Sequence, residues 1–434
     1  MSALTSVAYP ESPAVVPGRS LKGKRVGMVL FSTYPADPRP RRAVEALLKE
    51  GMSIDLICLQ DGNEPSREIL GNFDIVRAPL KHQRGNKLSY IYKYVAFISL
   101  SAAILAWRSV RRRYDLIYVH NMPDILVVSA LVPRLLGAKV ILDQHDPMPE
   151  VMKTIFGLDE RSFGVRLLTR LEKWSIARVD RVITVNMACK RIFGSRSCAP
   201  EKVALVMNSP DEAIFRFRKA HSLTSMNESL DRRFVMMYHG SLVERNGLDL
   251  AVEALAKIRA TMPGAVLRIY GRETPFLESV MCQVQSLGLS DCVSYLGPRS
   301  LEALVSEIES CDVGVIPNQR SPFADINTPT RIFEYLALGK PVIAPRTRGI
   351  EDYFGPDALL YFDCGNAEDL SRMMLSAAGH YRDAIANARR GQHVYLAHTW
   401  TQERNTLVST VADVLENRRE APSSLHRNIR PEAS

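Results

Sequence analysis

Short apolar runs rich in Val and Ile alternate with longer segments of helical periodicity along almost the whole sequence. Strands buried on both faces have this nearly continuous apolar character, and their alternation with helices is typical of βαβ units in a parallel sheet. The pattern therefore predicts an α/β fold. In the first half we expect strands that begin at Arg25, Ser53, Phe73, Tyr114, Ala138, Asp180 and Lys202. In the second half we expect strands that begin at Phe234, Ala265, Cys292, Asp312, Lys340 and Ala358.

The two sets of strands are separated by a polar stretch without periodicity, which has the composition of an interdomain linker. A chain of 434 residues is long enough for two domains that each bury a core. We therefore expect two facing, doubly wound, Rossmann-like domains, residues 25–215 and 216–400, with a ligand cleft at the carboxyl ends of their sheets. Residues 1–24 and 419–434 are expected to be a flexible leader and tail.

The net charge of +9 and the isoelectric point near 9.2 indicate an anionic partner, which could be nucleic acid, a membrane surface or a phosphorylated substrate. The excess charge is concentrated between Lys81 and Arg113, where eight Lys or Arg and no Asp or Glu surround an apolar stretch. No basic strand interleaved with aromatic residues and no recognition helix is visible. Nucleic acid is therefore not an expected partner.

The apolar segment 88–113 is almost long enough to span a bilayer. It lies between two expected strands of one sheet, so spanning would put parts of the first domain on opposite sides of the membrane. We therefore expect a helix that lies on an anionic membrane surface. Its anchoring residues would be Tyr90, Tyr94, Phe97 and Trp107, with a basic fringe of Arg108 and residues 111–113. A buried core helix capped by these arginines is the alternative.

The seven cysteines are odd in number and have no paired spacing, so neither a disulfide framework nor a zinc site is predicted. The N-terminus has no apolar run of signal-peptide length. We therefore expect a cytoplasmic protein that associates peripherally with the inner face of the membrane.

The sharpest local signal is the segment INTPTRIFEYLALGKPVIA, residues 326–344, in which a loop with a proline leads into a helix and then a strand. With Pro329 as the first helical residue, the amides of Thr330, Arg331 and Ile332 and the Arg331 guanidinium would form an anion site. One turn later, Glu334 could accept paired hydrogen bonds from neighbouring sugar hydroxyls. The alternative for Glu334 is an ordinary surface residue of an amphipathic helix.

A second signal is the strand and turn YHGSLVERNGLDLAVEAL, which begins at Tyr238. Gly240 would allow the backbone to approach a ligand closely, and Arg245 could bind two phosphate oxygens at once. A short turn with glycine is weak evidence alone, because most such turns only connect a strand to a helix.

In the first half, polar residues follow three expected strands. The segment ILDQHDPMPE places His145 and Asp146 after a buried strand, where a histidine can donate to a substrate hydroxyl. The earlier loop 32–42 contains no GxGxxG motif, so no dinucleotide site is expected. For each histidine, a hydrogen-bonded structural role is the alternative. The other candidate residues of these loops are Asp37, Arg39, His120 and Asn121.

These segments together resemble the retaining nucleotide-sugar glycosyltransferases of family 4, which have the GT-B fold of two Rossmann-like domains. The resemblance extends from about residue 25 to 418 and is carried by HNMPD, AKVILDQHDPMPE, YHGSLVERNGLDLAVEA and PTRIFEYLALGKPVIA, in the order and spacing of the family. It implies that the second domain binds a nucleoside-diphosphate sugar and that a C-terminal helix, residues 401–418, returns to the first domain.

The resemblance also implies residue roles. Arg245 and Arg331 would bind the diphosphate, Glu334 the ribose hydroxyls, and His145 would meet the transferred sugar and the acceptor. The expected catalytic residues are His145, Arg245 and Arg331. The expected donor-binding residues are Gly240, Ser241, Arg245, Gly271, Gly297, Thr330, Arg331 and Glu334, with Gly271 and Gly297 near the base. The expected acceptor-binding residues are Asp37, Arg39, His120, Asn121 and Asp146.

Two departures from the family pattern bear on these roles. The first of the two glutamates that the family commonly shows falls at Ile326, with Asp325 beside it. The common Arg and Lys of the diphosphate turn fall at Ser241 and Asn246, which moves that role to Arg245.

The expected function is transfer of a sugar, with retention of configuration, from a nucleotide donor to a hydroxyl of a lipid-linked saccharide in surface polysaccharide assembly. Front-face attack is favoured, in which the departing diphosphate helps to take the acceptor proton. No metal or cofactor is expected, because cations and helix amides can neutralise the phosphates. A sugar-nucleotide epimerase or phosphorylase on the same fold, and an inactive nucleotide-binding scaffold, are the alternatives.

Overall fold

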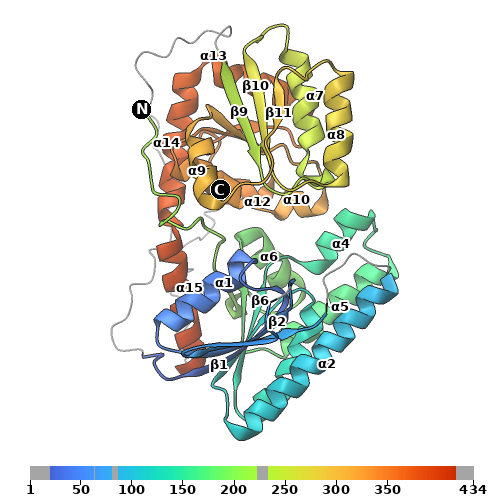
Figure 1. Ribbon diagram of the computed structural model, residues 1–434, viewed down its shortest axis with the longest axis vertical. Coiled ribbons are helices and arrows are strands. Elements are labelled where there is room, and N and C mark those ends of the chain that lie inside the picture. The colour runs from blue at the N-terminus through green and yellow to red at the C-terminus, as the bar shows by residue number, and fades with distance from the viewer. Residues whose placement is uncertain (1–19, 63, 81–86, 222–232, 417–434) are drawn as a thin grey trace, which may run out of the picture. The chain divides into compact units, whose positions relative to one another are not determined.

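The computed structural model describes residues 20–62, 64–80, 87–221 and 233–416 (Figure 1). The predicted tail and most of the predicted leader lie outside these residues. By backbone contacts the chain forms two compact units. Of the described residues, the first unit contains those up to Asp143, Arg178–Val182 and residues 405–416, and the second contains Gln144–Ala177 and those between Ile183 and Arg404.

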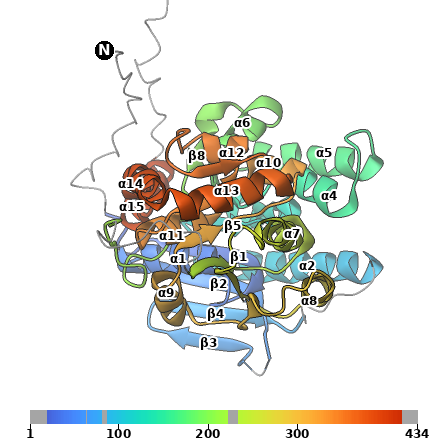
Figure 2. The same ribbon diagram turned by 90° about the horizontal axis from the view of Figure 1, so that it is seen from above.

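The first sheet has eight strands in the order β3-β4-β2-β1-β5-β6-β7-β8. Each strand expected in the first half is present, and strands β2, β1, β5 and β6 pair in parallel. The strand β3 was not expected, and it pairs antiparallel with β4 at the edge of the sheet (Figure 2). The strands are β1 (Arg25–Thr33), β2 (Ser53–Leu59), β3 (Arg67–Leu70), β4 (Phe73–Ala78), β5 (Leu116–His120), β6 (Lys139–Gln144), β7 (Arg181–Thr184) and β8 (Val203–Leu205).

The second sheet has six strands in the order β11-β10-β9-β12-β13-β14, and each strand pairs in parallel with its neighbours. Every strand expected in the second half is present, and the central strands are fully buried, as continuous apolar runs require. The strands are β9 (Phe234–His239), β10 (Ala265–Tyr270), β11 (Val293–Tyr295), β12 (Val313–Val315), β13 (Val342–Pro345) and β14 (Leu360–Phe362).

Helices connect these parallel strands, as crossovers between parallel strands require. Helix α7 packs against α8 and α13, and α11 packs against α14, so the second sheet is covered by helices. In the first half of the chain the helices are α1 (Pro38–Lys49), α2 (Lys87–Arg111), η1 (Asp124–Ala130), α3 (Leu131–Leu135), α4 (Met148–Phe156), α5 (Phe163–Ala177), α6 (Met187–Arg196) and η2 (Pro200–Lys202). The others are η3 (Glu244–Asn246), α7 (Leu248–Ile258), α8 (Pro275–Ser286), α9 (Leu301–Glu309), α10 (Pro322–Ile326), α11 (Thr330–Ala337), α12 (Arg348–Glu351), α13 (Ala367–Gly379), α14 (Tyr381–Ala397) and α15 (Trp400–Glu416).

The two sheets separate between Leu205, the end of β8, and Phe234, the start of β9. The backbone contacts divide the chain differently, because they group residues 144–177, with α4 and α5, into the second unit. They also assign residues 405–416 of α15 to the first unit. The domain boundary at residue 215 remains a prediction.

Candidate active site

The candidate donor site begins where β9 ends in the second unit. Gly240 follows this strand with a φ of +126°, a conformation that residues with a side chain rarely adopt. A Cβ at this position would lie 3.2 Å from Cδ of Arg331. Glycine is therefore required both by the backbone conformation and by the close approach of Arg331.

Arg331 extends from the first turn of α11 to the end of β9. Its Nη1 donates a hydrogen bond of 2.8 Å to the carbonyl oxygen of His239, and its Nη2 lies 3.5 Å from Oδ1 of the buried Asn318. Its guanidinium carbon is 4.7 Å from the centre of the Tyr238 ring, within the range of a cation–π contact. These contacts fix one positive charge beside Gly240.

Glu334 lies one turn after Arg331 and faces His239. The Nε2 of His239 is 3.4 Å from Oε2 of Glu334 and makes no hydrogen bond within the described residues. Burial and the positive charge of Arg331 lower the pKa of His239 to about 3. The imidazole is therefore neutral at physiological pH. The side chain of Glu334 is 15% exposed, so this carboxylate is not an ordinary surface residue.

The first turn of α11 offers two free backbone amides. Pro329 is the N-cap residue and the helix begins at Thr330, one residue later than expected. The N–H groups of Thr330 and Arg331 have no hydrogen-bond partner within the described residues, whereas the N–H of Ile332 donates to the carbonyl of Pro329. The expected anion site thus consists of two amides and one guanidinium, without Ile332.

Three glycines meet at the carboxyl ends of β9, β10 and β11. The N–H of Gly240 donates to the carbonyl of Tyr270, and the N–H of Gly271 donates to the carbonyl of Gly297. A Cβ at Gly271 would lie 2.3 Å from the carbonyl oxygen of Gly240, so no side chain fits there. The structure therefore brings together Gly240, Gly271 and Gly297. Each of them was a predicted donor-site residue, although they lie in three different segments of the sequence.

Arg245 lies in η3, and its side chain is exposed. Its carbonyl oxygen accepts a hydrogen bond of 3.1 Å from the N–H of Gln319, the residue after Asn318. Nδ2 of Asn246 donates to the carbonyl of Ser241 and closes the turn. The Arg245 guanidinium makes no hydrogen bond or ion pair within the part of the chain that the structure describes. It is available to a ligand, and its predicted role on the diphosphate stays a prediction.

The two positions where the first family glutamate would fall have different surroundings. Ile326 is buried, and its carbonyl oxygen accepts a hydrogen bond of 2.8 Å from Nδ2 of Asn186. The carboxylate of Asp325 is half-exposed and lies 3.6 Å from Nε of Arg348. Of this pair, only Asp325 has an exposed side chain.

In the first unit, the predicted acceptor residues surround a carboxylate that the sequence analysis did not single out. Asp143, at the end of β6, accepts hydrogen bonds from Nε and Nη2 of Arg39, at 3.0 and 2.6 Å, and from Tyr118 at 2.9 Å. Nδ1 of His120 lies 3.5 Å from the same carboxylate. Burial lowers the pKa of His120 to about 4. Arg39 and His120 are both buried, so their observed contacts are internal.

The remaining first-sheet candidates lie in the loops at the same strand ends. Asp37 is the N-cap of α1 and accepts a hydrogen bond from the N–H of Arg39. Asn121 is buried and donates to Asp124 at 3.1 Å. His145 and Asp146 follow β6 directly, are half-buried, and belong to the second unit. Their roles in acceptor binding and catalysis stay predictions.

Sequence reasoning missed three residues of these clusters, namely His239, Asn318 and Asp143. Each is a buried polar residue at or just after the end of an apolar strand. That position is a usable signal, because the carboxyl ends of parallel strands carry the ligand site in open α/β sheets.

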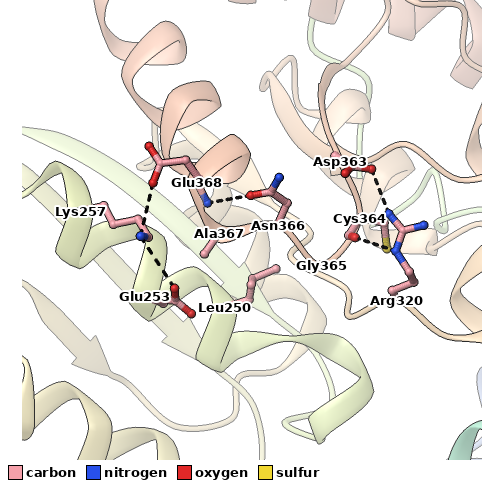
Figure 3. A pocket seen from close by; sticks show the side chains of 10 residues that line it. All are labelled: Leu250, Glu253, Lys257, Arg320, Asp363, Cys364, Gly365, Asn366, Ala367 and Glu368. Atoms are coloured by element: carbon pink, nitrogen blue, oxygen red, sulfur yellow. Dashed lines mark hydrogen bonds and ion pairs between the residues drawn. The ribbon is translucent and has the colours of Figure 1, made fainter.

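A separate pocket of about 440 Å³ lies between α7, the start of α13 and the loops that carry Arg320 and Asp363 (Figure 3). Its charges pair with one another: Arg320 lies 3.0 Å from Asp363, and Lys257 lies 3.3 Å from Glu368. Neither Arg331 nor Glu334 lines it. Because its cations are already paired with carboxylates, it is a weaker anion site than the one at α11.

Two mainly parallel sheets with a C-terminal helix that joins the first unit define the GT-B class of fold. Two family models match the chain: Glycosyltransferase Family 4 over residues 41–213, and Glycosyl transferases group 1 over residues 225–390. Together they cover most of the sequence, and the chain belongs to this glycosyltransferase family.

Similar proteins agree with this assignment. A GDP-mannose-dependent alpha-(1-6)-phosphatidylinositol monomannoside mannosyltransferase of Mycolicibacterium smegmatis is 28% identical over 44% of this chain and 50% of its own length. The probable glycosyltransferase WbjE of Pseudomonas aeruginosa is 21% identical over 55% of this chain and 59% of its own length. The matched region thus spans only about half the length of these curated relatives.

Solved structures share the fold. Sucrose-phosphate synthase from Thermosynechococcus elongatus superposes with a TM-score of 0.72 at 17% identity, covering 91% of this chain and 100% of that one. The Anabaena protein HepE, solved in complex with UDP-glucose, superposes with a TM-score of 0.66 at 14% identity, covering 90% and 99%.

Proposed function

We propose that the protein is a retaining glycosyltransferase that moves a sugar from a nucleoside-diphosphate sugar to a hydroxyl of a lipid-linked saccharide, in surface polysaccharide assembly at the cytoplasmic face of the membrane. The observation that carries the donor part is the cluster of Arg331, Glu334 and Gly240 at one strand end. It combines a fixed cation, two helix amides, a carboxylate and a glycine without a side chain of its own. Helix amides and a cation bind phosphate groups, and a carboxylate can accept hydrogen bonds from ribose hydroxyls.

The chemistry follows from where the charges lie. The bond from the sugar to the diphosphate breaks, and negative charge grows on the departing phosphate oxygen. Arg331 and the amides of the first turn of α11 would stabilise that charge, together with the exposed Arg245. The acceptor oxygen would attack the same face of the sugar, and its proton would pass to the departing diphosphate. His145 would orient the transferred sugar or the acceptor hydroxyl. These residues supply the neutralising charge themselves, so no cofactor or metal is part of the proposal.

Product analysis distinguishes sugar transfer from epimerase activity and from an inactive scaffold. The purified protein is incubated with a labelled nucleoside-diphosphate sugar, with and without lipid extract. We expect labelled saccharide in the lipid phase only when the extract is present, and His145→Ala should reduce it while nucleotide binding is kept. Consumption of the donor without an acceptor would indicate an epimerase. Donor binding without any turnover would indicate a scaffold.

The acceptor part of the proposal is supported by α2. Both ends of this helix connect to the first sheet, through β4 and β5, and it packs on η1, α3 and β1. By length and composition the stretch Ile91–Arg111 could cross a bilayer, and only 22% of it is buried. A helix tied at both ends to one sheet cannot cross, so we propose that its outer face lies on the membrane.

The outer face of α2 carries large apolar side chains and a basic end. Tyr92 is 70% exposed and Val110 is 76% exposed, and Arg111 stacks on the exposed Trp107 at 3.6 Å. Arg108 was expected in the basic fringe, but it is 11% exposed and pairs with Asp55 and Asp74 inside the unit. That expectation is corrected: the available cations are residues 111–113. Phe97, expected among the anchoring aromatic residues, is fully buried and packs against Phe31.

Sedimentation with vesicles tests this attachment. We expect binding to vesicles that contain phosphatidylglycerol, less binding with added salt, and less again when Arg111, Arg112 and Arg113 become Gln. Arg108 stays unchanged, because its loss would break internal ion pairs. A wild-type protein that remains in the supernatant at low salt would make a soluble acceptor the better proposal.

A further inference from the structure

We propose that the hairpin of α4 and α5, residues 148–177, is a lipid-contacting element that binds an anionic membrane surface independently of α2. The inference extends the membrane attachment proposed above to a second segment, and it is tested separately from donor binding. It rests on two features of the hairpin, namely an apolar tip and a row of cations without acidic partners.

Large apolar side chains are exposed on both sides of the hairpin turn. Helix α4 ends with Ile155 and Phe156, each 53% exposed, and α5 begins with Phe163, which is 79% exposed. Leu167 follows one turn later and is 42% exposed. The two helices pack side by side (Figure 1), so the connection between them brings these side chains to one end of the hairpin. Such a group of apolar side chains marks an interaction surface.

The same face of α5 is basic. Arg166, Arg170 and Lys173 are exposed and follow Phe163 at helical spacing, so they lie on the face that carries Phe163 and Leu167. The opposite face is buried through Val165, Glu172 and Ile176. Helix α5 is therefore amphipathic, and its outer face mixes aromatic, aliphatic and basic side chains.

The cations of this face have no acidic partner within the described residues. Glu172 is turned inward and binds Arg196, Glu160 pairs with Lys153 at 3.1 Å, and Asp159 accepts from the backbone of Arg161. Arg166 and Arg170 are four residues apart, so each repels the other in the absence of an anion. An anionic surface would relieve this repulsion.

An apolar tip beside unpaired cations is complementary to a lipid surface. Interfacial helices bury their apolar face at the boundary of headgroups and acyl chains, while basic residues at the rim attract anionic lipid. A second copy of this chain would bring the same cations against each other. A lipid surface is therefore the occupant that the charges favour.

The experiment uses the full chain and vesicles of phosphatidylcholine with or without phosphatidylglycerol. One variant, Phe163→Ser with Leu167→Ser, removes the apolar contact, and its control is Leu287→Ser with Leu396→Ser, which are similarly exposed leucines of the same unit. The other variant, Arg166→Gln with Arg170→Gln, is matched in net charge by Arg216→Gln with Lys219→Gln, both exposed cations. Calorimetry with a nucleoside diphosphate and thermal melting accompany each sedimentation series.

We expect the apolar variant to lower vesicle binding at least tenfold and the charge variant to lower it about 25-fold, at about fivefold for each cation. Both controls should bind nearly as the wild type does, and nucleotide affinity should be unchanged in all variants. The inference is overturned if either hairpin variant binds as its control does, or if the wild type binds no anionic vesicle. It is also overturned if the hairpin variants change the mass in sedimentation equilibrium, because the face would then join two copies. A wild type that binds vesicles but no nucleotide would contradict the proposed function and leave this inference intact.

Discussion

The Nε2 atom of His239 lies 3.4 Å from Oε2 of Glu334, at the end of the central strand β9. The histidine is neutral, because burial and the neighbouring Arg331 lower its pKa to about 3. A neutral histidine does not compensate the charge of the Glu334 carboxylate. The carboxylate oxygens can therefore accept hydrogen bonds from paired ribose hydroxyls.

Glu334→Gln should weaken the binding of a nucleoside diphosphate about tenfold to a hundredfold, because one charged hydrogen-bond acceptor contributes about 1.5 to 3 kcal/mol. Calorimetry with a ribonucleoside diphosphate and its 2′-deoxy analogue measures the effect. The wild type should prefer the ribose form, and the variant should lose that preference. The control is Glu302→Gln on the exposed surface of α9. Equal affinities of wild type and variant would show that Glu334 does not contact the ribose.

Arg245→Ala should reduce turnover without destabilising the fold. Its guanidinium is exposed and has no partner within the described residues, so the free energy of unfolding should change by at most about 0.5 kcal/mol. Loss of a cation that stabilises the departing diphosphate should cost roughly a hundredfold in kcat. Urea unfolding and the transfer assay are compared with Arg372→Ala, an exposed arginine on α13. Full activity of Arg245→Ala would remove this residue from the catalytic set.

Asp143→Asn should destabilise the first unit strongly. The side chain of Asp143 is 2% exposed and pairs with Arg39, so its replacement leaves a buried cation without its counterion. Breaking a buried pair from one side costs about 3 to 5 kcal/mol. The control is Asp363→Asn, whose pair with Arg320 is exposed and should contribute at most about 1 kcal/mol. Similar urea midpoints for the two variants would contradict the structural role of Asp143.

Stability should fall as the solution is acidified below the ordinary histidine pKa. His120 and His239 have folded-state pKa values of about 4 and about 3, against an ordinary value of 6.5. The unfolded chain therefore binds protons that the folded protein does not. Between neutral pH and about pH 5, each histidine should lower the free energy of unfolding by about 2 kcal/mol.

His239→Gln removes one of these titrating groups, so it should remove about half of that pH dependence. The exposed His221 provides the matched control, because His221→Gln should leave the dependence unchanged. Urea unfolding at several pH values measures both. A slope for His239→Gln equal to that of the wild type would contradict the buried, neutral state of His239.

The positions of the strands could be predicted from the sequence, because both sheets are built of continuous apolar runs. The exception is Arg67–Leu70, which forms β3 at the exposed edge of the first sheet, where no apolar run is needed. The sequence also placed Gly240 and Arg331 in one predicted donor site, because the motif of each residue adjoins a strand. Their distance in space is set by the parallel order of β9, β12 and β13, which local patterns do not encode.

The burial of individual polar side chains could not be predicted from the sequence. Arg39 and His120 contact Asp143 inside the first unit, and their role toward an acceptor stays a prediction. Arg108 was expected at a membrane, yet it pairs with Asp55 and Asp74 inside the unit. Whether a polar residue after a strand faces a ligand or a neighbouring carboxylate depends on side chains far away in the sequence. Asp143 is such a partner of Arg39, 104 residues distant.

Titration calorimetry of the wild type and of Arg331→Gln with UDP, GDP and ADP tests the central claim most directly. The account predicts that at least one of the three nucleotides binds the wild type, and that Arg331→Gln weakens it about tenfold or more through loss of a charged hydrogen bond to phosphate. Circular dichroism confirms that the variant is folded. Absence of binding by all three nucleotides, or equal affinity of wild type and folded variant, would contradict a nucleoside-diphosphate site at the start of α11.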